Sequence, residues 1–456
     1  MADTPLQRPV TRRRLLGTAG ATGLSLGVTG AAARLTGGGA PATVTPRGEG
    51  GGRRPPRPRP AGAPGLPPGG RRGAPRSPGP PPSETVTPLA EVGSRREMFH
   101  VKHQPGITTP LHARGHLIAF DLAPGAGRKE AAALLRRWSQ TAARLMAGEP
   151  APAGGHDTGI ALDAGPSALT VTFGFGHSFF ARTGLEKQRP AALDPLPEFS
   201  SDRLDARRSN GDLWVQIGAD DALVAFHALR AVQKDAGQAA RVRWQMDGFN
   251  RSPGATEKPM TTRNLMGQID GTNNPAPSDE DFATRVRVPA DGDPAWMAGG
   301  SYVVFRRIRM LLDDWEKLSV NGQEAVMGRR KADGAPLTGG TETTEPDLER
   351  VGKDGELVIP LNAHARITRP DQNGGAAMLR RPFSYHDGID DEGVPDAGLL
   401  FLCWQADPLR GFVPVQRKLD RGDALSAFIR HEASGLYAVP GGAPKGGYVG
   451  QELLEG

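Results

Sequence analysis

GHLIAFDL at residues 115–122 and KEAAALLRRWSQTAARLMA at residues 129–147 together decide the fold class. The first segment is a mostly apolar run with the length of one strand. In the second, apolar residues recur at spacings of four, four and three between Leu134 and Leu145, which is the period of an amphipathic helix. A strand followed at once by such a helix predicts a mixed α and β structure.

The same alternation continues along the first half of the chain. Strands are expected at 168–174, 212–218 and 241–246, and a helix at 222–233. The resulting order (strand, helix, strand, strand, helix, strand) is typical of a ferredoxin-like domain, in which helices cover one face of an antiparallel sheet.

A second set of elements begins after residue 300. Strands are expected at 301–307, 399–405 and 435–439, with helices from about residue 310 and near 423–430. We therefore predict an α+β protein made of two ferredoxin-like domains with antiparallel sheets, one over 85–262 and one over 263–456.

The first 36 residues have the pattern of an export signal. TRRRLL at residues 11–16 precedes a weakly apolar stretch, rich in Gly, Ala and Leu, that runs to about residue 33. Paired arginines before such a stretch resemble a twin-arginine (Tat) signal, which predicts export to the periplasm, the cell wall or the medium. The stretch has too many glycines for a good membrane-spanning helix, so we expect no span after signal removal. A disordered basic tail is the alternative.

Residues 37–84 are predicted to be a disordered linker rich in Pro, Gly and Arg, because 27 of the 46 residues from 37 to 82 are Gly or Pro. Residues 1–80 contain 13 Arg and only two acidic residues, which gives a net charge of +11. The whole chain carries +6, so residues 81–456 carry −5. A folded part with net negative charge argues against a nucleic-acid partner.

The densest chemical signal is GQIDGTNNP at residues 267–275. These residue types suit a surface turn, which is the plain interpretation. A turn does not explain the apolar residues upstream of Asp270, which are Leu265, Met266 and Ile269. Because glycine has no Cβ, the backbone at Gly267 and Gly271 can lie close against a flat ligand. A carboxylate in such surroundings is a candidate for moving protons.

Gly-x-x-Asp-Gly followed by Thr-x-Asn-Pro resembles the signature of the dye-decolourising (DyP-type) peroxidases, and more narrowly of their Tat-exported deferrochelatase/peroxidase subgroup. Three further stretches are similar to segments of that subgroup: HQPGI at 103–107, DLWVQIG at 212–218 and RNLM at 263–266. The resemblance covers roughly residues 97–450. It implies a peroxidase with haem b in the second domain, which reduces hydrogen peroxide and oxidises dyes or other one-electron donors.

The resemblance also implies which residues hold the haem. AHAR at 363–366 looks like the family segment with the proximal ligand, so His364 would bind the iron. A ligating imidazole usually needs a partner on its other nitrogen, and Asp423 is that partner by resemblance. A helix N-cap is an equal alternative for Asp423. Gly267 and Gly271 would lie against the haem.

LRRPFSY at 379–385 resembles the family segment with the distal arginine, although Pro382 and Phe383 replace the more usual Gly and Tyr. Arg380, the first of the pair, is the residue carried over, with Arg381 as the alternative. Arg380 would stabilise the charge that develops on the departing peroxide oxygen, while Asp270 moves the proton.

LLFLCWQ at 399–405 looks like the strand whose Leu399 and Phe401 line the haem pocket on the peroxide side, and plain core packing is compatible with that role. Cys403 is the only cysteine, so disulfides within the chain and cysteine-based metal clusters are excluded. Amid apolar neighbours it is more often inert core than a thiolate ligand. Tyr385 and Trp404 could relay electrons from bulky dyes, but core packing is the plainer interpretation.

Two other functions stay open beside peroxidase activity. One is release of iron from haem, and the other is haem carriage without catalysis, against which the Asp270–Arg380 pair argues. Small-molecule reductants are the expected partners, and a homo-oligomer is left open. His112 and His116 straddle a turn, so no metal is expected there, and Gly174-Phe175-Gly176 lacks the third glycine of a dinucleotide loop.

Overall fold

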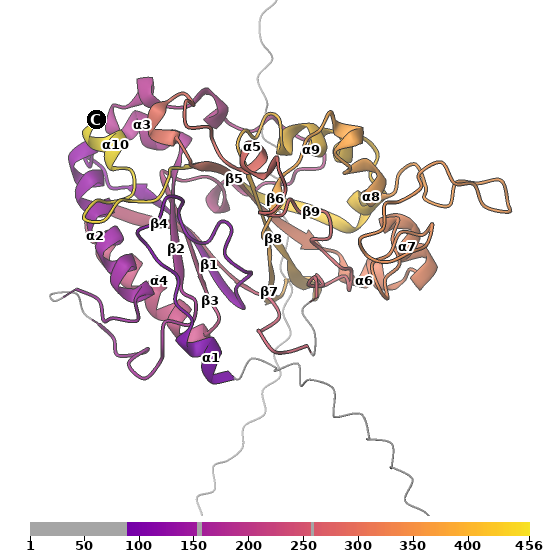
Figure 1. Cartoon of the computed structure of the whole chain (residues 1–456), viewed down its shortest axis with the longest axis horizontal. Helices are drawn as coiled ribbons and strands as arrows, with labels where there is room; N and C mark the ends of the chain where they lie inside the picture. The colour runs from indigo at the N-terminus through magenta and orange to yellow at the C-terminus, as the bar shows by residue number, and fades with distance from the viewer. Residues whose placement is uncertain (1–88, 153–156, 257–259) are drawn as a thin grey trace, which may run out of the picture. The chain divides into compact units, whose positions relative to one another are not determined.

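The structure, a computed structural model, describes residues 89–152, 157–256 and 260–456 (Figure 1). The predicted signal region, 1–36, and the predicted linker, 37–84, lie outside the described residues.

The first half of the described chain follows the predicted order. Its strands and main helices are β1 (Arg114–Leu122), α2 (Arg128–Met146), β2 (Thr170–Gly176), β3 (Leu213–Ala219), α4 (Ala222–Ala236) and β4 (Ala240–Phe249), with the short helices α1 (Leu89–Ser94) and α3 (His177–Thr183). The strands lie in the order β2-β3-β1-β4, and every pairing is antiparallel. This is the ferredoxin-like arrangement that the sequence predicts.

The second half repeats that topology with longer connections. Its strands are β5 (Ser301–Met310), β6 (Leu379–Arg380), β7 (Phe383–Ile389), β8 (Pro395–Gln405) and β9 (Ile429–Val439). Its helices are α5 (Phe282–Val286), α6 (Leu312–Glu316), α7 (Val320–Met327), α8 (His364–Ile367), α9 (Phe412–Gly422) and α10 (Gln451–Glu455). The strands lie in the order β9-β5-β8-β7, and β6 pairs with β8 as well. The chain therefore contains two ferredoxin-like domains.

The two sheets join edge to edge into a closed ring of strands. β2 pairs with β9, and β4 pairs with β7, each over only one or two residues. Buried side chains from both halves fill the ring: the Trp214 ring stacks on Tyr437 at 5.5 Å and lies 6.0 Å from Trp404. Tyr385 belongs to the same interior cluster. The plain interpretation of Tyr385 and Trp404 as core residues is what the packing shows.

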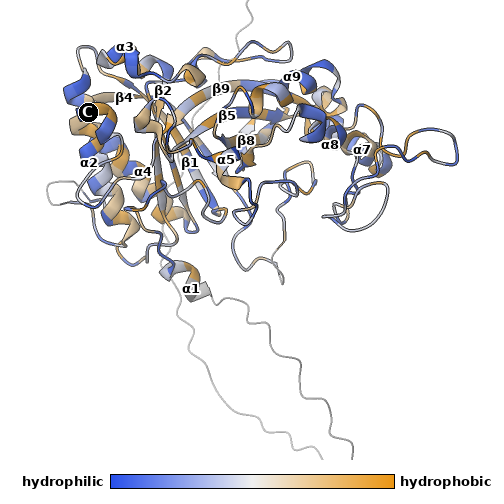
Figure 2. Cartoon of the chain, turned by 45° about the horizontal axis from the view of Figure 1, so that its top comes forward, coloured by the Kyte–Doolittle hydropathy of each residue, from blue (hydrophilic) through white to orange (hydrophobic). Residues whose placement is uncertain are grey.

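Helices α2 and α4 pack beside each other on the sheet of the first half (Figure 1). Asp221 caps α4 by accepting hydrogen bonds from the backbone N–H groups of Leu223 and Val224, at 2.8 and 2.9 Å. The Trp138 indole on α2 donates to the Val232 carbonyl on α4 at 2.9 Å. Both helices carry hydrophilic and hydrophobic residues along their length, as helices with one buried face do (Figure 2).

The helix predicted near 423–430 is a short 3-10 helix, Ala424–Phe428, and it ends earlier than predicted because β9 begins at Ile429. The longer helix in this region, α9, precedes that segment and was missed, because Pro414 reads as a helix breaker although it lies in the first turn, where proline is tolerated. The helix expected from about residue 310 begins at Leu312 and ends at Glu316, since β5 extends through Met310.

Within the described residues, no helix has the length and apolar character of a membrane span.

Candidate active site

A cavity of about 300 Å³ lies in the second domain and gathers most of the predicted site residues. Its walls are mainly apolar. The apolar wall residues include Met266, Ile269, Ile308, Met310, Met327, Leu399, Phe401, Leu425 and Ile429. The polar residues of interest are Asp270, Arg380 and His364, which all line this same space although they come from three distant segments.

Asp270 and Arg380 form an ion pair on one side of the cavity. The Arg380 guanidinium donates to Oδ1 of Asp270 at 2.8 Å, and the Asn264 amide lies 3.4 Å from Oδ2. The side chains are 16% and 28% exposed, so both remain reachable from the cavity. The sequence suggested a carboxylate among apolar residues, whereas the structure gives it a guanidinium partner from 110 residues away.

The loop that carries Asp270 is stabilised by hydrogen bonds from Arg263, which does not line the cavity. Arg263 donates to the carbonyls of Gly267, Lys331 and Ala332 at 2.9, 2.6 and 2.7 Å. Gly267 has a φ of +78° and lies against the Lys331 side chain, outside the set of residues that line the cavity. The positive φ explains a glycine at this position by the loop conformation alone, and the contact of Gly267 with a flat ligand stays a prediction.

Gly271 does line the cavity, as predicted for a residue beside the ligand. Its φ of +132° is a conformation that glycine adopts readily and other residues rarely do. A side chain there would also contact Thr261, with its Cβ only 3.2 Å from Thr261 Cγ2.

His364 is the first residue of α8 and lines the cavity. Its Nδ1 is hydrogen-bonded to Oδ2 of Asp423 at 2.8 Å, and Asp423 is buried. The other carboxylate oxygen, Oδ1, accepts the backbone N–H of Leu425 at 3.1 Å. The two interpretations of Asp423, histidine partner and N-cap, are thus both correct, one for each oxygen.

Electrostatics link the two sides of the cavity. Burial alone would lower the pKa of His364, but the Asp423 carboxylate outweighs burial, and the pKa is raised above the ordinary value of 6.5. The charges of Arg380 and Asp270 also act on His364, in opposite directions. The acid–guanidinium pair is therefore near enough to the imidazole to influence it across the cavity.

Strand β8 places alternate residues on the cavity wall, as strand geometry requires. Leu399 and Phe401 line the cavity, whereas Leu400, Leu402 and Trp404 point into the ring interior. Cys403 is fully buried off the cavity, and burial raises the pKa of its thiol. That environment fits inert core rather than a thiolate ligand.

The structure separates the two adjacent arginines. Arg380 lines the cavity, while the guanidinium of Arg381 turns away to donate to the Thr109 carbonyl. Burial lowers the pKa of Arg381 to about 10. The first arginine of the pair is thus the one that faces the candidate site.

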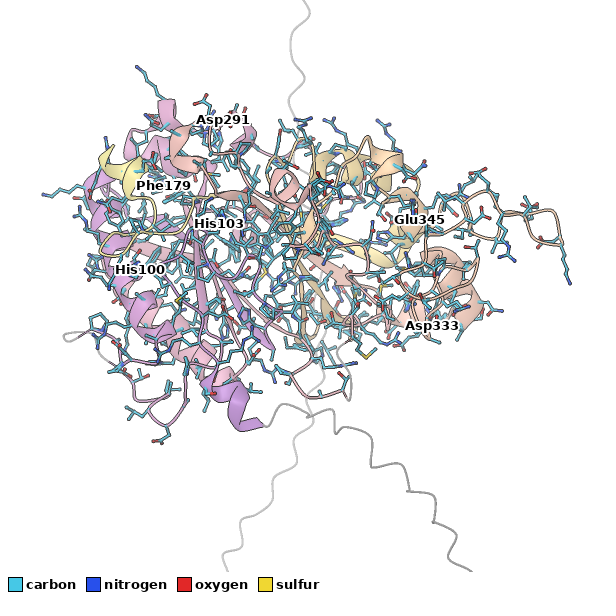
Figure 3. The ribbon with its side chains drawn as sticks, viewed as in Figure 1. His100, His103, Phe179, Asp291, Asp333 and Glu345 are labelled. Carbon is cyan, nitrogen blue, oxygen red and sulfur yellow. The ribbon has the colours of Figure 1, made fainter. Side chains whose placement is uncertain are left out.

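The sequence analysis missed three arginines that line the cavity: Arg306 of β5, which is paired with Asp202, and two residues in irregular segments, Arg329 and Arg369. Arg329 donates to the carbonyls of Gly334 and Glu342 at 2.8 and 2.7 Å, and within the described residues it makes no ion pair with a carboxylate. Arg369 is paired with Glu345, which is labelled in Figure 3. No local pattern marks either residue, because each lies in an irregular segment that only the fold brings to the cavity.

The remaining sequence candidates lie elsewhere. His112 is buried and its Nε2 is 3.0 Å from the Ala168 carbonyl, whereas His116 is 2.6 Å from Asp247. The glycines at 174 and 176 belong to buried strand β2. Within the described residues, no cluster of His, Cys, Asp and Glu could hold a metal by itself.

A mainly apolar cavity lined by the Asp423-bound imidazole of His364 and by an acid–guanidinium pair suits a flat prosthetic group with a metal at its centre. The histidine supplies an Nε2 lone pair, its Nδ1 being taken by Asp423. Arg329 supplies a cation without a carboxylate partner in the described chain, for which the carboxylates of a porphyrin are suitable acceptors. Fold and site together define a haem protein of the α+β class.

Comparison with known proteins agrees with this assignment as a haem protein. The family model described as Dyp-type peroxidase, N-terminal, matches residues 104–250, and the model described as Dyp-type peroxidase, C-terminal, matches 261–444. The chain belongs to the Dyp-type peroxidase family. It is a haem peroxidase, and its cofactor is haem.

Individual relatives show the same kinship. A dye-decolorizing peroxidase of Thermobifida fusca is 48% identical over 366 residues, which cover 77% of this chain and 84% of the relative. A deferrochelatase of Escherichia coli K12 is 36% identical over 375 residues, covering 79% and 87%. The crystal structure of a DyP-type peroxidase from Streptomyces coelicolor is 78% identical with a TM-score of 0.80, covering 81% of this chain and all of that one. Ferric DtpA from Streptomyces lividans is 78% identical with a TM-score of 0.79 and the same coverage.

Proposed function

We propose that this peroxidase binds its haem iron through His364, moves a proton of hydrogen peroxide with Asp270 and stabilises the developing negative charge with Arg380. One observation carries the proposal: the His364–Asp423 pair and the Asp270–Arg380 pair line a single cavity. Bound haem supplies the iron that reduces the peroxide and takes electrons from the donor.

The chain's residues hold the haem in a defined way. Asp423 fixes the ring of His364 and directs the Nε2 lone pair toward the cavity. Arg329 and Arg369 bind the porphyrin carboxylates, since both guanidiniums line the cavity. Leu399 and Phe401 line the same cavity as the acid–guanidinium pair, and their apolar side chains limit the access of bulk water to it.

Asp270 moves one proton. Its Oδ1 accepts from Arg380, so the proton taken from one peroxide oxygen is held at Oδ2 and delivered to the other oxygen, which leaves as water. The Arg380 guanidinium remains cationic and donates to the oxygen on which negative charge accumulates.

The test is Asp270→Asn in haem-loaded protein. The amide keeps the size of the side chain but cannot take up the proton, so the rate of reaction with peroxide should fall roughly 100-fold to 10,000-fold with haem still bound. Asp291→Asn, at an exposed aspartate, is the matched control and should leave the rate unchanged. A wild-type rate for Asp270→Asn would remove Asp270 from the mechanism.

His364→Ala tests the iron ligand separately. Haem content should fall or the absorption spectrum should shift, while the haem-free fold persists because His364 is a partly exposed residue on a short helix. Unchanged haem content with an unchanged spectrum would contradict the assignment.

Iron release from haem is a second candidate function, favoured by the relatives that are named deferrochelatase. Iron release differs from peroxidase activity in its product, which is porphyrin without a metal. Incubation of the protein with haem should then yield metal-free porphyrin, recognised by its fluorescence. Peroxide-dependent oxidation of a dye without free porphyrin would support peroxidase activity alone.

We further propose that the chain is exported by the Tat route. The support is the sequence of residues 1–36, with the TRRRLL motif before a weakly apolar stretch. Replacement of Arg12, Arg13 and Arg14 by Lys should retain the protein inside the cell, whereas the unaltered signal exports it. Equal export of both forms would refute this route.

A further inference from the structure

We infer that Asn274 is a positioning residue for the peroxide reaction: its side-chain amide clamps the backbone of Arg380 and so fixes where the guanidinium lies. The inference rests on the role proposed above for Arg380. The Asn274 Nδ2 donates to the Arg380 carbonyl at 2.9 Å, and the Asn274 Oδ1 accepts the Arg380 N–H at 3.1 Å. One amide thus satisfies both backbone groups of one residue.

The Asn274 side chain makes the two hydrogen bonds to Arg380 that a neighbouring strand would otherwise make. β6 has only two residues, and it pairs with β8 along one edge, where Arg380 faces Cys403 and the Arg381 N–H donates to Leu402. The N–H and C=O of Arg380 itself point to the opposite edge, as antiparallel geometry requires of alternate residues. In the described chain no further strand lies there, so the Asn274 amide takes the place of a neighbouring strand.

Asn274 also connects the two halves of the site. It follows Asp270 by four residues, and its backbone N–H donates to the Gly271 carbonyl at 3.0 Å, which closes the turn. Asp270 holds the Arg380 guanidinium at 2.8 Å from one end of this turn, and Asn274 holds the Arg380 backbone from the other. A shift of the turn therefore moves acid and guanidinium together.

The chemistry demands an amide at this position. Asparagine offers a donor and an acceptor side by side, matched to a backbone C=O and N–H. Aspartate would keep the acceptor but set a carboxylate oxygen against the Arg380 carbonyl, and alanine would remove both contacts. Asn274 is not among the residues that line the cavity, so it acts through Arg380 and not on the substrate.

The experiment compares Asn274→Ala and Asn274→Asp with the wild type as haem-loaded protein. We expect the second-order rate with hydrogen peroxide to fall about 10-fold to 100-fold in both, because a displacement near 1 Å in a catalytic group has that effect. The affinity of the ferric protein for fluoride, an anion that accepts a hydrogen bond from a nearby guanidinium, should fall as well. The haem content should be unchanged, and so should the absorption bands that report ligation of the iron by His364.

Gln104→Ala is the matched control. The Gln104 amide also clamps one residue, accepting the Phe173 N–H at 2.8 Å and donating to its carbonyl at 3.0 Å, and it donates in addition to the Pro440 carbonyl at 3.0 Å. Because Gln104 is buried and makes this extra bond, its loss should lower stability at least as much as the loss of Asn274, while leaving the peroxide rate and fluoride affinity at wild-type values. Equal losses of rate in Gln104→Ala and Asn274→Ala would show a general folding defect and overturn the inference.

Two further measurements separate this inference from the role of Arg380. In an Arg380→Leu background, Asn274→Ala should cause no additional loss of rate; an additional loss of more than about threefold would show that Asn274 acts elsewhere. Hydrogen exchange of the haem-free chain should show faster exchange of the Arg380 amide in Asn274→Ala, but not in Asn274→Asp, which keeps the acceptor. Unchanged exchange in Asn274→Ala would overturn the clamp, whereas a wild-type rate in Arg380→Leu would overturn the proposed function instead.

Discussion

At the scale of single residues, Asp423 shows how one carboxylate serves two partners. Oδ2 faces the Nδ1 of His364, and Oδ1 caps the turn that begins at Ala424. A substitution that preserves the cap can therefore isolate the effect on the imidazole.

Asp423→Asn is the residue-scale prediction for haem binding. Asparagine caps helical turns about as well as aspartate, but as a neutral amide it no longer stabilises the imidazole N–H. We expect haem affinity to fall about 10-fold to 100-fold, the usual effect of losing a partner behind a metal ligand. The melting temperature should change little at pH values above the raised pKa of His364, where the imidazole is neutral. Haem titration and thermal unfolding of the haem-free protein measure the two effects. Asp423→Ala should lose about 1 kcal/mol of stability in addition, because the cap is lost too.

The same pair gives a pH dependence. Because the pKa of His364 is raised in the fold, the pair stabilises the haem-free protein at pH values below the unfolded pKa near 6.5. That stability is lost as the pH rises through the raised pKa of His364 in the folded state.

The difference in unfolding free energy between wild type and Asp423→Asn should therefore be larger at pH 5 than at pH 9 in denaturant titrations. Haem uptake should show the opposite trend, since only the neutral imidazole binds iron. A stability difference that grew with pH would contradict the assignment.

At the scale of elements, the register of β5 and β8 depends on Gly398. It pairs with Arg309, and a Cβ on Gly398 would lie 2.0 Å from the Ile308 carbonyl oxygen, a backbone atom that cannot move alone. The neighbouring residues Ile308 and Leu399 line the haem cavity.

Gly398→Ala should accordingly destabilise the protein by about 1–3 kcal/mol and weaken haem binding, because the two strands must separate to admit the methyl group. Gly422→Ala is the matched control, because no atom lies within 4 Å of a Cβ added at this position. Alanine reduces the conformational entropy of the unfolded chain, so this substitution should leave the stability unchanged or raise it slightly. Chemical unfolding and haem titration of both variants measure the effect. Equal stability of the two variants would mean that the strands adapt freely.

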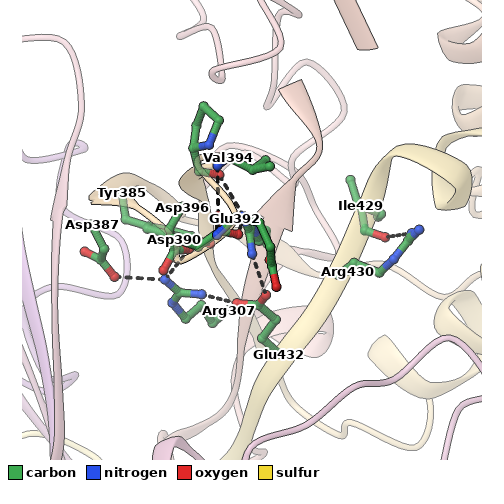
Figure 4. Close-up of polar contacts among 12 residues, drawn as sticks. Arg307, Tyr385, Asp387, Asp390, Glu392, Val394, Asp396, Ile429, Arg430 and Glu432 are labelled. Atoms are coloured by element: carbon green, nitrogen blue, oxygen red, sulfur yellow. Dashed lines mark hydrogen bonds and ion pairs between the residues drawn. The ribbon is translucent and has the colours of Figure 1, made fainter. Parts of the chain in front are cut away.

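A second feature of these strands is the buried Arg307 of β5. Figure 4 shows it among Asp387, Asp396 and Glu432. Asp387 and Asp396 lie 2.8 Å away, and the guanidinium lies 4.1 Å from the centroid of the Tyr385 ring. Strands β5, β7, β8 and β9 are thus tied by one cation, which explains how a charged segment can be a central strand.

Arg307→Met should destabilise the protein by about 1–3 kcal/mol at neutral pH, because it leaves three carboxylates without their cation, although their partial exposure to water limits the cost. Burial already raises the pKa of Glu432, and Arg307 opposes that rise, so its removal raises the pKa further. The penalty should therefore shrink as the pH falls and the carboxylates take up protons. Unfolding curves at two pH values test this, and a penalty that does not depend on pH would contradict the ion-pair explanation.

At the scale of the whole molecule, the two ferredoxin-like domains share their cores. The cluster inside the strand ring combines Trp214 and Trp244 of the first half with Trp404 and Tyr437 of the second. The larger cluster beneath α2 and α4 likewise includes Leu436 and Tyr448 from the second half. Neither half can bury these faces alone.

We therefore predict that a fragment spanning 85–262 will not unfold cooperatively, whereas residues 85–456 will melt in one transition. Calorimetry of both chains provides the comparison, and coincident loss of haem absorbance and far-ultraviolet dichroism tests two-state behaviour in the longer one. A fragment with its own sharp transition would show that the halves are independent.

The sequence by itself determined the order of most elements, because the periods of strand and helix are local properties of the chain. It also singled out the segments around Asp270, His364 and Arg380, since their residue types and order resemble a known family. It failed at α9 and at the start of β9, where a proline and a charged segment hid the local pattern.

Only the tertiary structure decided what these segments do to one another. The contacts of Asp270 with Arg380, of Asn274 with the Arg380 backbone and of His364 with Asp423 join residues 110, 106 and 59 positions apart. Arg329 and Arg369 reach the cavity from irregular segments with no period to detect. Local sequence encodes backbone conformation, whereas such contacts exist only once the closed ring of strands fixes distant segments side by side.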